Sequence, residues 1–544
     1  MLFIALGSVF FIPFLGGVHL FDWDEINFAE ISREMIVTND YLRVQVNFQP
    51  FWEKPPLFFW LQVISMKIFG INEFAARFPN AITGIISLLV IIRIGTRLFN
   101  QKFGFIWAMA YFGSILPHLY FKSGIIDPLF NLFIFSGLYQ IILFSWKKEN
   151  GKEFTSSTSK YLNLIAGGIF IGLAILTKGP VAYLIVLLVM TVYWIKKRFR
   201  FYISIPNFIV LTLIAIIVTF AWLGPETLKN GPWLLKEFTK YQFRLLSTPD
   251  AGHAGFPGYH FFVLLLGCFP ASVFAIRGFY KIKPEKDFQR DFRSWMIILF
   301  WVVLILFSIV QSKIVHYSSL AYFPLTFLAA VTISRLIEGK LKFNRWLKFG
   351  IISIGLLYSL VALIIPFLGR NIGVIKPLFK NDVFALANLE ADVNWTGWES
   401  TAGFLLIAVI FICLLLINKK KIETGLKTLF FGTAAFLFLG LIFFVGKIEM
   451  YSQNANIEFC KSLEGKDCYV ITSGFKSYAQ YFYTKKKPPE NEKSYEIGWL
   501  TWEDVDKDVY IIAKINLIDY WRNVYTVKEI GSKNGFIFYK RDAP

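Results

Sequence analysis

Apolar segments long enough to cross a lipid bilayer recur along most of this chain, and they constrain its fold more than any other feature. Hydrophobic residues make up 56% of the sequence and charged residues only 17%, which is more apolar surface than a soluble domain can bury. A membrane-spanning helix needs about 20 such residues. We therefore predict a polytopic α-helical membrane protein with about thirteen transmembrane helices, at residues 2–20, 78–97, 103–121, 125–145, 161–177, 179–195, 204–223, 259–276, 294–311, 319–335, 349–368, 401–417 and 428–446.

Basic residues are concentrated in alternate loops between these segments, and such loops favour the cytoplasmic side of a membrane. We expect five loops to be cytoplasmic: 147–160, 196–200, 277–293, 335–348 and 419–427. An odd number of spans then places the N-terminus inside and the C-terminus outside. Contact with anionic lipid accounts for the net charge of +19. The sequence contains no nucleic-acid motif, so we expect no nucleic-acid partner.

The first outer loop, residues 21–77, is more than a linker. Residues 25–37 have apolar positions at helical spacing. Residues 55–69 begin with two prolines, which suit a helix start, and run apolar up to a glycine. This second run is too short to span, so we expect an interfacial helix that lies on the membrane.

The composition changes at about residue 447, where charged residues return and apolar runs shorten. We predict a transmembrane domain over 1–446 and a small outer α/β domain over 447–544. Its expected elements are strands at 468–472, 509–513, 524–529 and 536–539 and a helix at 475–482. Cys460 and Cys468 fall in this outer domain, and the sequence leaves open whether they form a disulfide.

The motif FDWDE directly follows the first apolar segment and places three carboxylates at the outer membrane surface. Partial desolvation there raises the pKa of a carboxylate towards a value suited to a general base. Asp24 is the candidate base, with Asp22 and Glu25 beside it. Asp24 could also cap the helix that follows it, and the two roles are compatible.

Further charged residues lie on the predicted outer side, before the interfacial helix or at the ends of spans. Glu53 and Lys54, in FWEKPPLFFW, suit a metal ligand and a phosphate contact, or only an exposed ion pair. Asp127 begins a span, where a charge needs a function or a partner, and Lys122 is the nearby candidate partner. Lys178, in LTKGP, suits an anion contact or a snorkelling side chain.

Two later outer loops carry additional candidates. Arg244 offers a guanidinium suited to phosphate, and His253 offers a metal ligand or a proton carrier. In QSKIVHYSS, Lys313, His316 and Tyr317 are polar groups that suit a pocket, although loops are commonly polar.

The sequence contains no Walker motif and no GxGxxG, CxxC or GxSxG motif. An activated substrate would therefore arrive through the membrane rather than as a soluble nucleotide. A lipid or lipid-linked-sugar flippase is the alternative class. Such transporters show internal repeats and broken helices near the midplane, whereas here the polar groups cluster on one predicted face and no repeat is apparent.

Together, the acidic motif and the sequences AEISREM, EKPPL and NEFAARFP resemble the GT-C glycosyltransferases, most closely the ArnT-like aminoarabinose transferases of lipid A and the related protein O-mannosyltransferases. The resemblance implies transfer of a sugar, with inversion, from a polyprenyl-phosphate-linked donor to a lipid, glycan or protein acceptor at the outer face. After SK, the sequence IVHYSS departs from the loop expected of lipid A enzymes.

The resemblance also implies roles for individual residues. The catalytic candidates are Asp24, Asp127 and Glu25. The candidates for binding the donor phosphate are Lys54, Arg244, Lys178 and Lys313. Glu53 and His253 would hold a divalent metal ion if the enzyme uses one. On this hypothesis Asp24 orients or deprotonates the acceptor hydroxyl while the polyprenyl phosphate leaves.

Overall fold

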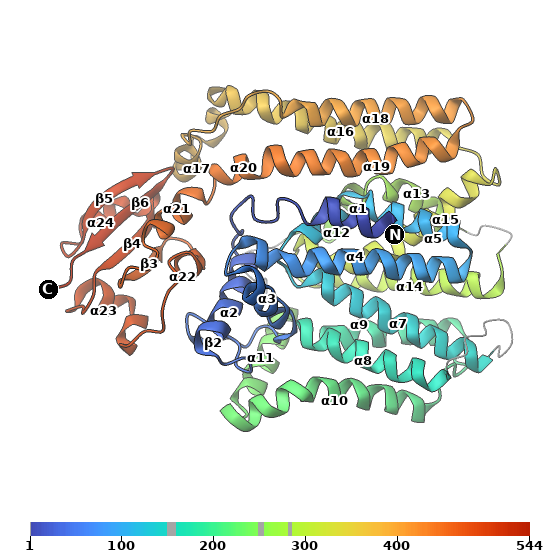
Figure 1. The fold of residues 1–544 in the computed structure, drawn as a ribbon, viewed down its shortest axis with the longest axis horizontal. Helices are drawn as coiled ribbons and strands as arrows, with labels where there is room; N and C mark the ends of the chain where they lie inside the picture. Colours follow the sequence, from blue (N-terminus) through green and yellow to red (C-terminus); the bar gives the residue numbers. More distant parts are fainter. Residues whose placement is uncertain (1, 150–158, 248–254, 281–284) are drawn as a thin grey trace.

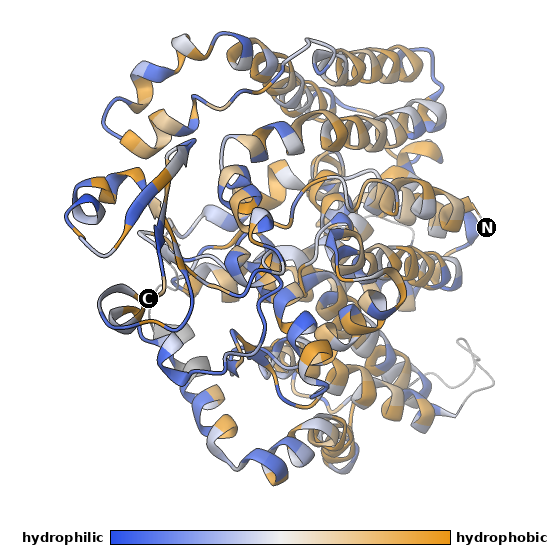
Figure 2. Cartoon of the chain, turned by 60° about the vertical axis from the view of Figure 1, so that its left-hand side comes forward, coloured by the Kyte–Doolittle hydropathy of each residue, from blue (hydrophilic) through white to orange (hydrophobic). Residues whose placement is uncertain are grey.

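The computed structural model describes residues 2–149, 159–247, 255–280 and 285–544. Long helices run side by side in a bundle, and a small domain with a β-sheet covers one end of it (Figure 1). Apolar residues dominate the bundle helices, whereas polar and apolar residues mix in the end domain (Figure 2). This arrangement confirms the predicted polytopic helical fold with a C-terminal α/β domain.

In the described ranges, nine helices are long and apolar enough to cross a membrane, or ten if a bent helix pair forms one span. The nine are α4 (Glu73–Leu98), α7 (Asp127–Glu149), α8 (Lys160–Lys178), α10 (Ile205–Asn230), α14 (Asp287–Ile309), α15 (Tyr322–Ile337) with the preceding 3-10 turn η2 (Val315–Ala321), α16 (Arg345–Arg370), α18 (Ser400–Asn418), and α19 (Ile422–Gly440), which continues through η5 (Leu441–Val445) and α20 (Gly446–Met450).

The predicted number of about thirteen spans is too high by this criterion, although every predicted segment contains helix. The other four segments are short or broken: α1 (Leu2–Phe11), α5 (Gln101–Phe112) followed by α6 (Ile115–Leu119) and η1 (Tyr120–Lys122), α9 (Val181–Lys196), and α12 (Tyr259–Gly267) bent by 114° against α13 (Ala271–Gly278). Hydropathy finds apolar runs but not such breaks. Pro270, for example, lies between α12 and α13 and cannot donate a helical hydrogen bond.

The first outer loop folds into two helices beside a short hairpin, β1 (Gln45–Val46) and β2 (Gln49–Pro50). The first helix, α2 (Asp24–Thr38), is buried over most of its length and is therefore part of the protein interior. The second, α3 (Leu57–Phe69), exposes Ile64 and Ile68. An exposed apolar face suits the predicted contact of this helix with the membrane.

The C-terminal domain contains a four-stranded sheet in the order β3-β4-β6-β5. β3 (Tyr469–Ser473) pairs in parallel with β4 (Val509–Lys514), and β6 (Phe536–Arg541) pairs antiparallel with both β4 and β5 (Lys528–Lys533). The remaining helices outside the bundle are α11 (Trp233–Ser247), η3 (Ile372–Val374), η4 (Lys376–Phe379), α17 (Val383–Asn388), α21 (Asn454–Ser462), α22 (Ala479–Phe482), η6 (Glu492–Tyr495), α23 (Ile497–Trp502), η7 (Ile515–Leu517) and α24 (Ile518–Arg522).

Two predicted elements of the C-terminal domain, one strand and one helix, need correction. The strand expected at 524–529 begins only at Lys528, because Val524 packs into the core as the chain leaves α24. The helix expected at 475–482 is reduced to its last turn, α22. The predicted boundary between residues 446 and 447 falls inside the continuous helix Ile422–Met450. Cys460 and Cys468 are both free, so they form no disulfide.

The C-terminal domain shares a hydrophobic core with the first outer loop. Ile26 and Met66 from that loop are buried in the same cluster as Ile457, Phe482 and Phe538. Polar contacts reinforce the packing, since the Arg33 guanidinium, buried in α2, donates to the Lys486 carbonyl oxygen. The outer domain is therefore docked directly on the loop that carries the predicted catalytic motif.

Candidate active site

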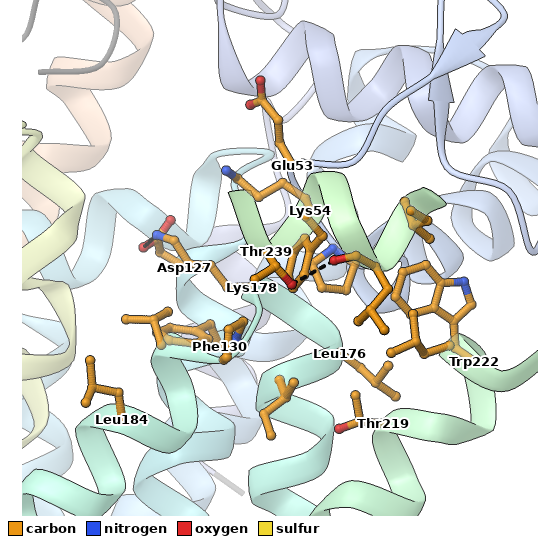
Figure 3. A pocket seen from close by; sticks show the side chains of 18 of the residues that line it. Glu53, Lys54, Asp127, Phe130, Leu176, Lys178, Leu184, Thr219, Trp222 and Thr239 are labelled. Atoms are coloured by element: carbon orange, nitrogen blue, oxygen red, sulfur yellow. Dashed lines mark hydrogen bonds and ion pairs between the residues drawn. The ribbon is translucent and has the colours of Figure 1, made fainter. Parts of the chain in front are cut away.

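A cavity of about 550 Å³ opens beside the first outer loop. Its mouth carries the charged side chains of Glu53, Lys54, Asp127 and Lys178, and its depth is apolar (Figure 3). The apolar wall includes Phe130, Leu176, Leu184, Trp222, Leu223, Leu234, Phe238 and Phe307. Four of the nine predicted site residues, taken from three distant parts of the sequence, therefore meet at one cavity.

An ion pair joins two neighbouring helices at the cavity mouth. Asp127 is the first residue of α7 and Lys178 is the last residue of α8, and the Lys178 Nζ lies 2.5 Å from Asp127 Oδ1. The Lys178 ammonium also lies 5.1 Å from the centre of the Tyr317 ring. The prediction that Lys122 is the partner of Asp127 is wrong, because the Lys122 ammonium donates to the carbonyl oxygens of Phe10 and Pro13 instead.

His316 bridges the space between two predicted catalytic carboxylates. Its Nε2 lies 3.7 Å from Asp24 Oδ2 and 3.8 Å from Asp127 Oδ2. The Oδ2 atom of Asp127 is buried and has no hydrogen-bond partner within the described ranges. The sequence showed His316 only as a polar residue in a short outer loop, because nothing in its spacing reveals that this loop meets the first one. The arrangement leaves one carboxylate oxygen directed at an imidazole.

Asp24 is the first residue of α2, and its side chain is 41% exposed. The cap position of α2 is Trp23, and no side-chain hydrogen bond caps the helix. The capping alternative for Asp24 is therefore not observed. An accessible carboxylate near a histidine can accept a proton from an approaching hydroxyl group.

Asp22 has a structural contact instead. Its carboxylate accepts hydrogen bonds from the Ser477 hydroxyl and from the Tyr478 backbone N–H, both in the C-terminal domain. Burial raises the pKa of Asp22 to about 6, against the opposing effect of these hydrogen bonds. Asp22 thus helps to hold the outer domain beside the site.

Glu25 does not line this cavity, and it lies in the wall of a separate cavity together with Arg77. Its carboxylate forms a buried ion pair with Arg77, at 2.7 Å, and also accepts the backbone N–H groups of Phe21 and Gly124. Burial raises the pKa of Glu25, but the Arg77 charge and these hydrogen bonds outweigh it, so the pKa lies below its usual value. A carboxylate with both oxygens engaged anchors the loop and is poorly suited to the predicted catalytic role.

The remaining predicted residues are distributed around the site. Glu53 and Lys54 lie just before α3 and line the cavity mouth, where Lys54 extends on the Asp127 side (Figure 3). The Lys313 ammonium donates to the carbonyl oxygens of Phe307, Ser308 and Val310 at the end of α14, and it does not line the cavity.

Arg244 lies on α11, which lines the cavity with other residues, and its own side chain is exposed. His253 lies outside the described residues. No cluster of three His, Cys, Asp or Glu side chains that could hold a metal ion occurs in the part of the chain that the structure describes. The described residues supply Glu53 but not its predicted partner and by themselves form no metal site, and no step of the proposed reaction runs through a metal.

Comparison with known proteins supports the resemblance seen in the motifs. Residues 53–223 match the family described as dolichyl-phosphate-mannose-protein mannosyltransferase. The chain is 25% identical over 428 residues to the undecaprenyl phosphate-alpha-4-amino-4-deoxy-L-arabinose arabinosyl transferase of Pectobacterium carotovorum, covering 74% of this chain and 70% of that protein. It is 28% identical to an enzyme of the same name from Pseudomonas fluorescens, and that match covers 75% of this chain and 74% of the relative.

The fold also matches solved structures. The crystal structure of ArnT from Cupriavidus metallidurans bound to undecaprenyl phosphate superposes with a TM-score of 0.75 at 16% identity, covering 99% of this chain and 97% of that one. The archaeal oligosaccharyltransferase AglB from Archaeoglobus fulgidus matches more distantly, with a TM-score of 0.50 at 12% identity, over 96% and 70% of the two chains. These likenesses confirm the predicted GT-C architecture.

Proposed function

We propose that this chain, an ArnT-like membrane glycosyltransferase with the GT-C fold, moves a sugar from a polyprenyl phosphate to an acceptor at the outer face of the membrane. The observation that carries the proposal is the cavity itself. Its long apolar wall suits an isoprenoid chain, and the cations of Lys54 and Lys178 at its mouth suit the attached phosphate.

The donor phosphate would lie at this mouth. There it would compete with Asp127 for Lys178, and the two cations would offset the charge that develops as the phosphate leaves. The bond from the sugar C1 to the phosphate oxygen breaks, and the electron pair stays on the released polyprenyl phosphate. The acceptor oxygen forms the new bond to C1 from the opposite face, which inverts the configuration.

Asp24 would accept the proton of the acceptor hydroxyl group. Its exposure and its position 3.7 Å from His316 support this role. His316 would hold Asp24 and the unpartnered oxygen of Asp127 in a fixed relation without reacting itself. Asp24 thus acts on the acceptor, and Lys54 and Lys178 act on the donor.

The acceptor has a candidate entrance in a second cavity beside His316. This cavity, of about 450 Å³, is lined by His316 together with Tyr120, Ser123, the ion-paired Glu25 and Arg77, and the apolar side chains of Phe21 and Phe438. His316 also lies 3.8 Å from Asp127, which lines the donor cavity. The mixed polar and apolar wall of the second cavity suits a lipid-linked acceptor with a polar head, such as a glycolipid, better than a soluble protein.

We also propose the orientation in the membrane. Helix α3, which directly follows the cavity residues Glu53 and Lys54, lies with α2 at the same end of the bundle as the C-terminal sheet, and the turn between α18 and α19 lies at the opposite end (Figure 1). That turn belongs to the basic loops expected in the cytoplasm. The N-terminus would then be cytoplasmic and the site and outer domain periplasmic, in a bacterial inner membrane.

Transfer can be tested with the purified protein and radiolabelled polyprenyl-phosphate sugars, offered with total envelope lipids and proteins. We expect label to move into a lipid fraction with wild type, and to move much less with Lys54→Met, whose side chain reaches the donor mouth. A folded wild-type protein that moves no label from any donor would contradict the proposal and favour the flippase alternative.

A further inference from the structure

A further apolar groove, separate from the two cavities of the candidate active site, lies between bundle helices. It has a volume of about 570 Å³ and runs between α13, α15 and α16. Its apolar wall is formed by Val273, Ile276, Leu336, Leu347, Gly350 and Ile354. α13 and α15 lie towards the end of the bundle that faces away from the C-terminal sheet (Figure 1).

The mouth of this groove is positively charged. Arg277, in the last turn of α13, and Lys342, in the turn before α16, both line it. Asn344 caps the N-terminus of α16 there, and the helix end adds partial positive charge. Among the described residues that line the groove, none is acidic.

One atom at the groove lacks a partner. Nη1 of Arg277 is buried and makes no hydrogen bond to any described residue. An unpaired buried guanidinium nitrogen is costly, because the lost hydration is not replaced. An anionic group in the groove mouth would supply the missing acceptor.

Aromatic side chains mark the depth of this mouth in the membrane. Tyr280 and Trp346 line the groove and are 66% and 67% exposed, respectively. Exposed Trp and Tyr residues are enriched at the level of the lipid headgroups. The charged mouth therefore lies where lipid phosphates lie, and the apolar wall extends towards the acyl chains.

We propose that this groove is a binding site for an anionic phospholipid of the leaflet at the basic end of the bundle. The phosphate group contacts Arg277 and Lys342, and one acyl chain lies along the wall formed by α13 and α16. A lipid with a compensating ammonium in its headgroup satisfies this all-positive mouth less well, so the site selects anionic lipids.

The test is native mass spectrometry of the full-length protein, purified in detergent and titrated with phosphatidylglycerol, cardiolipin or phosphatidylcholine. We expect wild type to retain the anionic lipids preferentially. Arg277→Gln/Lys342→Gln should bind them about 30-fold more weakly, from the contribution of each basic residue near an anionic headgroup. The matched control Lys419→Gln/Lys420→Gln removes two charges from the nearby α18–α19 turn, outside the groove, and should bind like wild type.

Three results would overturn the site: equal retention of phosphatidylcholine by wild type, unchanged binding by the groove variant, or an equal loss in groove and control variants. The last result would mean general charge attraction to the basic end. If the double groove variant does not fold, the single variant Lys342→Glu, on the exposed turn, is tested instead. Loss of its preference for anionic lipids over phosphatidylcholine would then support the site. Lipid binding is measured without transfer, so it is independent of the proposed activity.

Discussion

Lys178 and Asp127 form an ion pair at 2.5 Å that joins the end of one membrane helix to the start of its neighbour, at the mouth of the apolar cavity. Asp127 is almost fully buried. The pair therefore has two roles to separate by mutation, since it stabilises the α7–α8 contact and also presents a cation to the cavity.

Lys178→Gln should lower both stability and donor affinity. The uncompensated Asp127 carboxylate should cost about 3–5 kcal/mol in the free energy of unfolding, and the KM for the donor should rise. Adding Asp127→Asn should restore much of the melting temperature but not the KM, because the cation is still missing. Thermal melts in detergent and transfer kinetics measure the two effects. A double variant with wild-type KM would show that Lys178 acts only on stability.

His316→Ala should lower kcat by about 10- to 100-fold, because Asp24 and Asp127 lose the group that holds them in place. The matched control is His19→Gln. His19 also contacts carboxylates, Glu449 and Glu458, but it lies outside both cavities. Transfer rates of the two variants at saturating donor show whether the effect is specific to His316. Equal, small effects in both would exclude a specific role for His316.

Glu25→Gln should reduce stability and leave kcat at saturating acceptor largely intact in the folded fraction, because Arg77 already engages the carboxylate. The substitution leaves the Arg77 charge buried without its counter-ion, at a cost of about 3–5 kcal/mol. Melting temperature and kcat per folded molecule, the latter from active-site-normalised assays, distinguish the two outcomes. A stable Glu25→Gln protein without activity would restore Glu25 to the catalytic group.

Asp22 should give a pH-dependent stability. Its pKa is raised from 3.8 to about 6 in the folded protein, so the folded state binds the proton more tightly. The stabilisation from protonation is complete below the unfolded pKa and is lost as the pH rises through about 6.

Asp22→Asn keeps a hydrogen-bonding side chain against Ser477 and Tyr478 without the charge. Its melting temperature should exceed that of wild type at pH 7.5, and the difference should shrink as the pH falls to 4. Asp504→Asn, on the exposed surface of the same outer domain, is the control and should show no such trend. A pH-independent difference for Asp22→Asn would refute the assignment.

The sequence predicted most of the helices because an apolar run long enough to span is visible without any knowledge of packing. It did not predict where runs break, as between α12 and α13, because a bend depends on which neighbours accept the freed backbone groups. The cores of β3, β4 and β6 were predicted from their apolar runs. The position of β5 was predicted wrongly because this strand is exposed and mostly polar, so its residues show no alternating strand pattern.

The site was predicted as a set of residues but not as a geometry. Glu53 and Lys54 of the first outer loop meet Asp127 and Lys178, which lie at the outer ends of α7 and α8. The pairing of Asp127 with Lys122 was expected from closeness in sequence. The 3-10 turn at Tyr120–Lys122 instead brings the Lys122 ammonium to the carbonyl oxygens of Phe10, in α1, and Pro13, just after it. The contact of His316 with Asp24 joins segments almost 300 residues apart, and no local pattern encodes it.

The proposed role of Asp24 is tested most directly by the rate of sugar transfer by wild type, Asp24→Asn and Asp24→Glu at saturating donor and acceptor. We expect an unchanged melting temperature and a fall in kcat of about 10²- to 10⁴-fold for Asp24→Asn, with partial activity in Asp24→Glu. Full activity of a folded Asp24→Asn protein would contradict the assignment of Asp24 as the group that accepts the acceptor's proton.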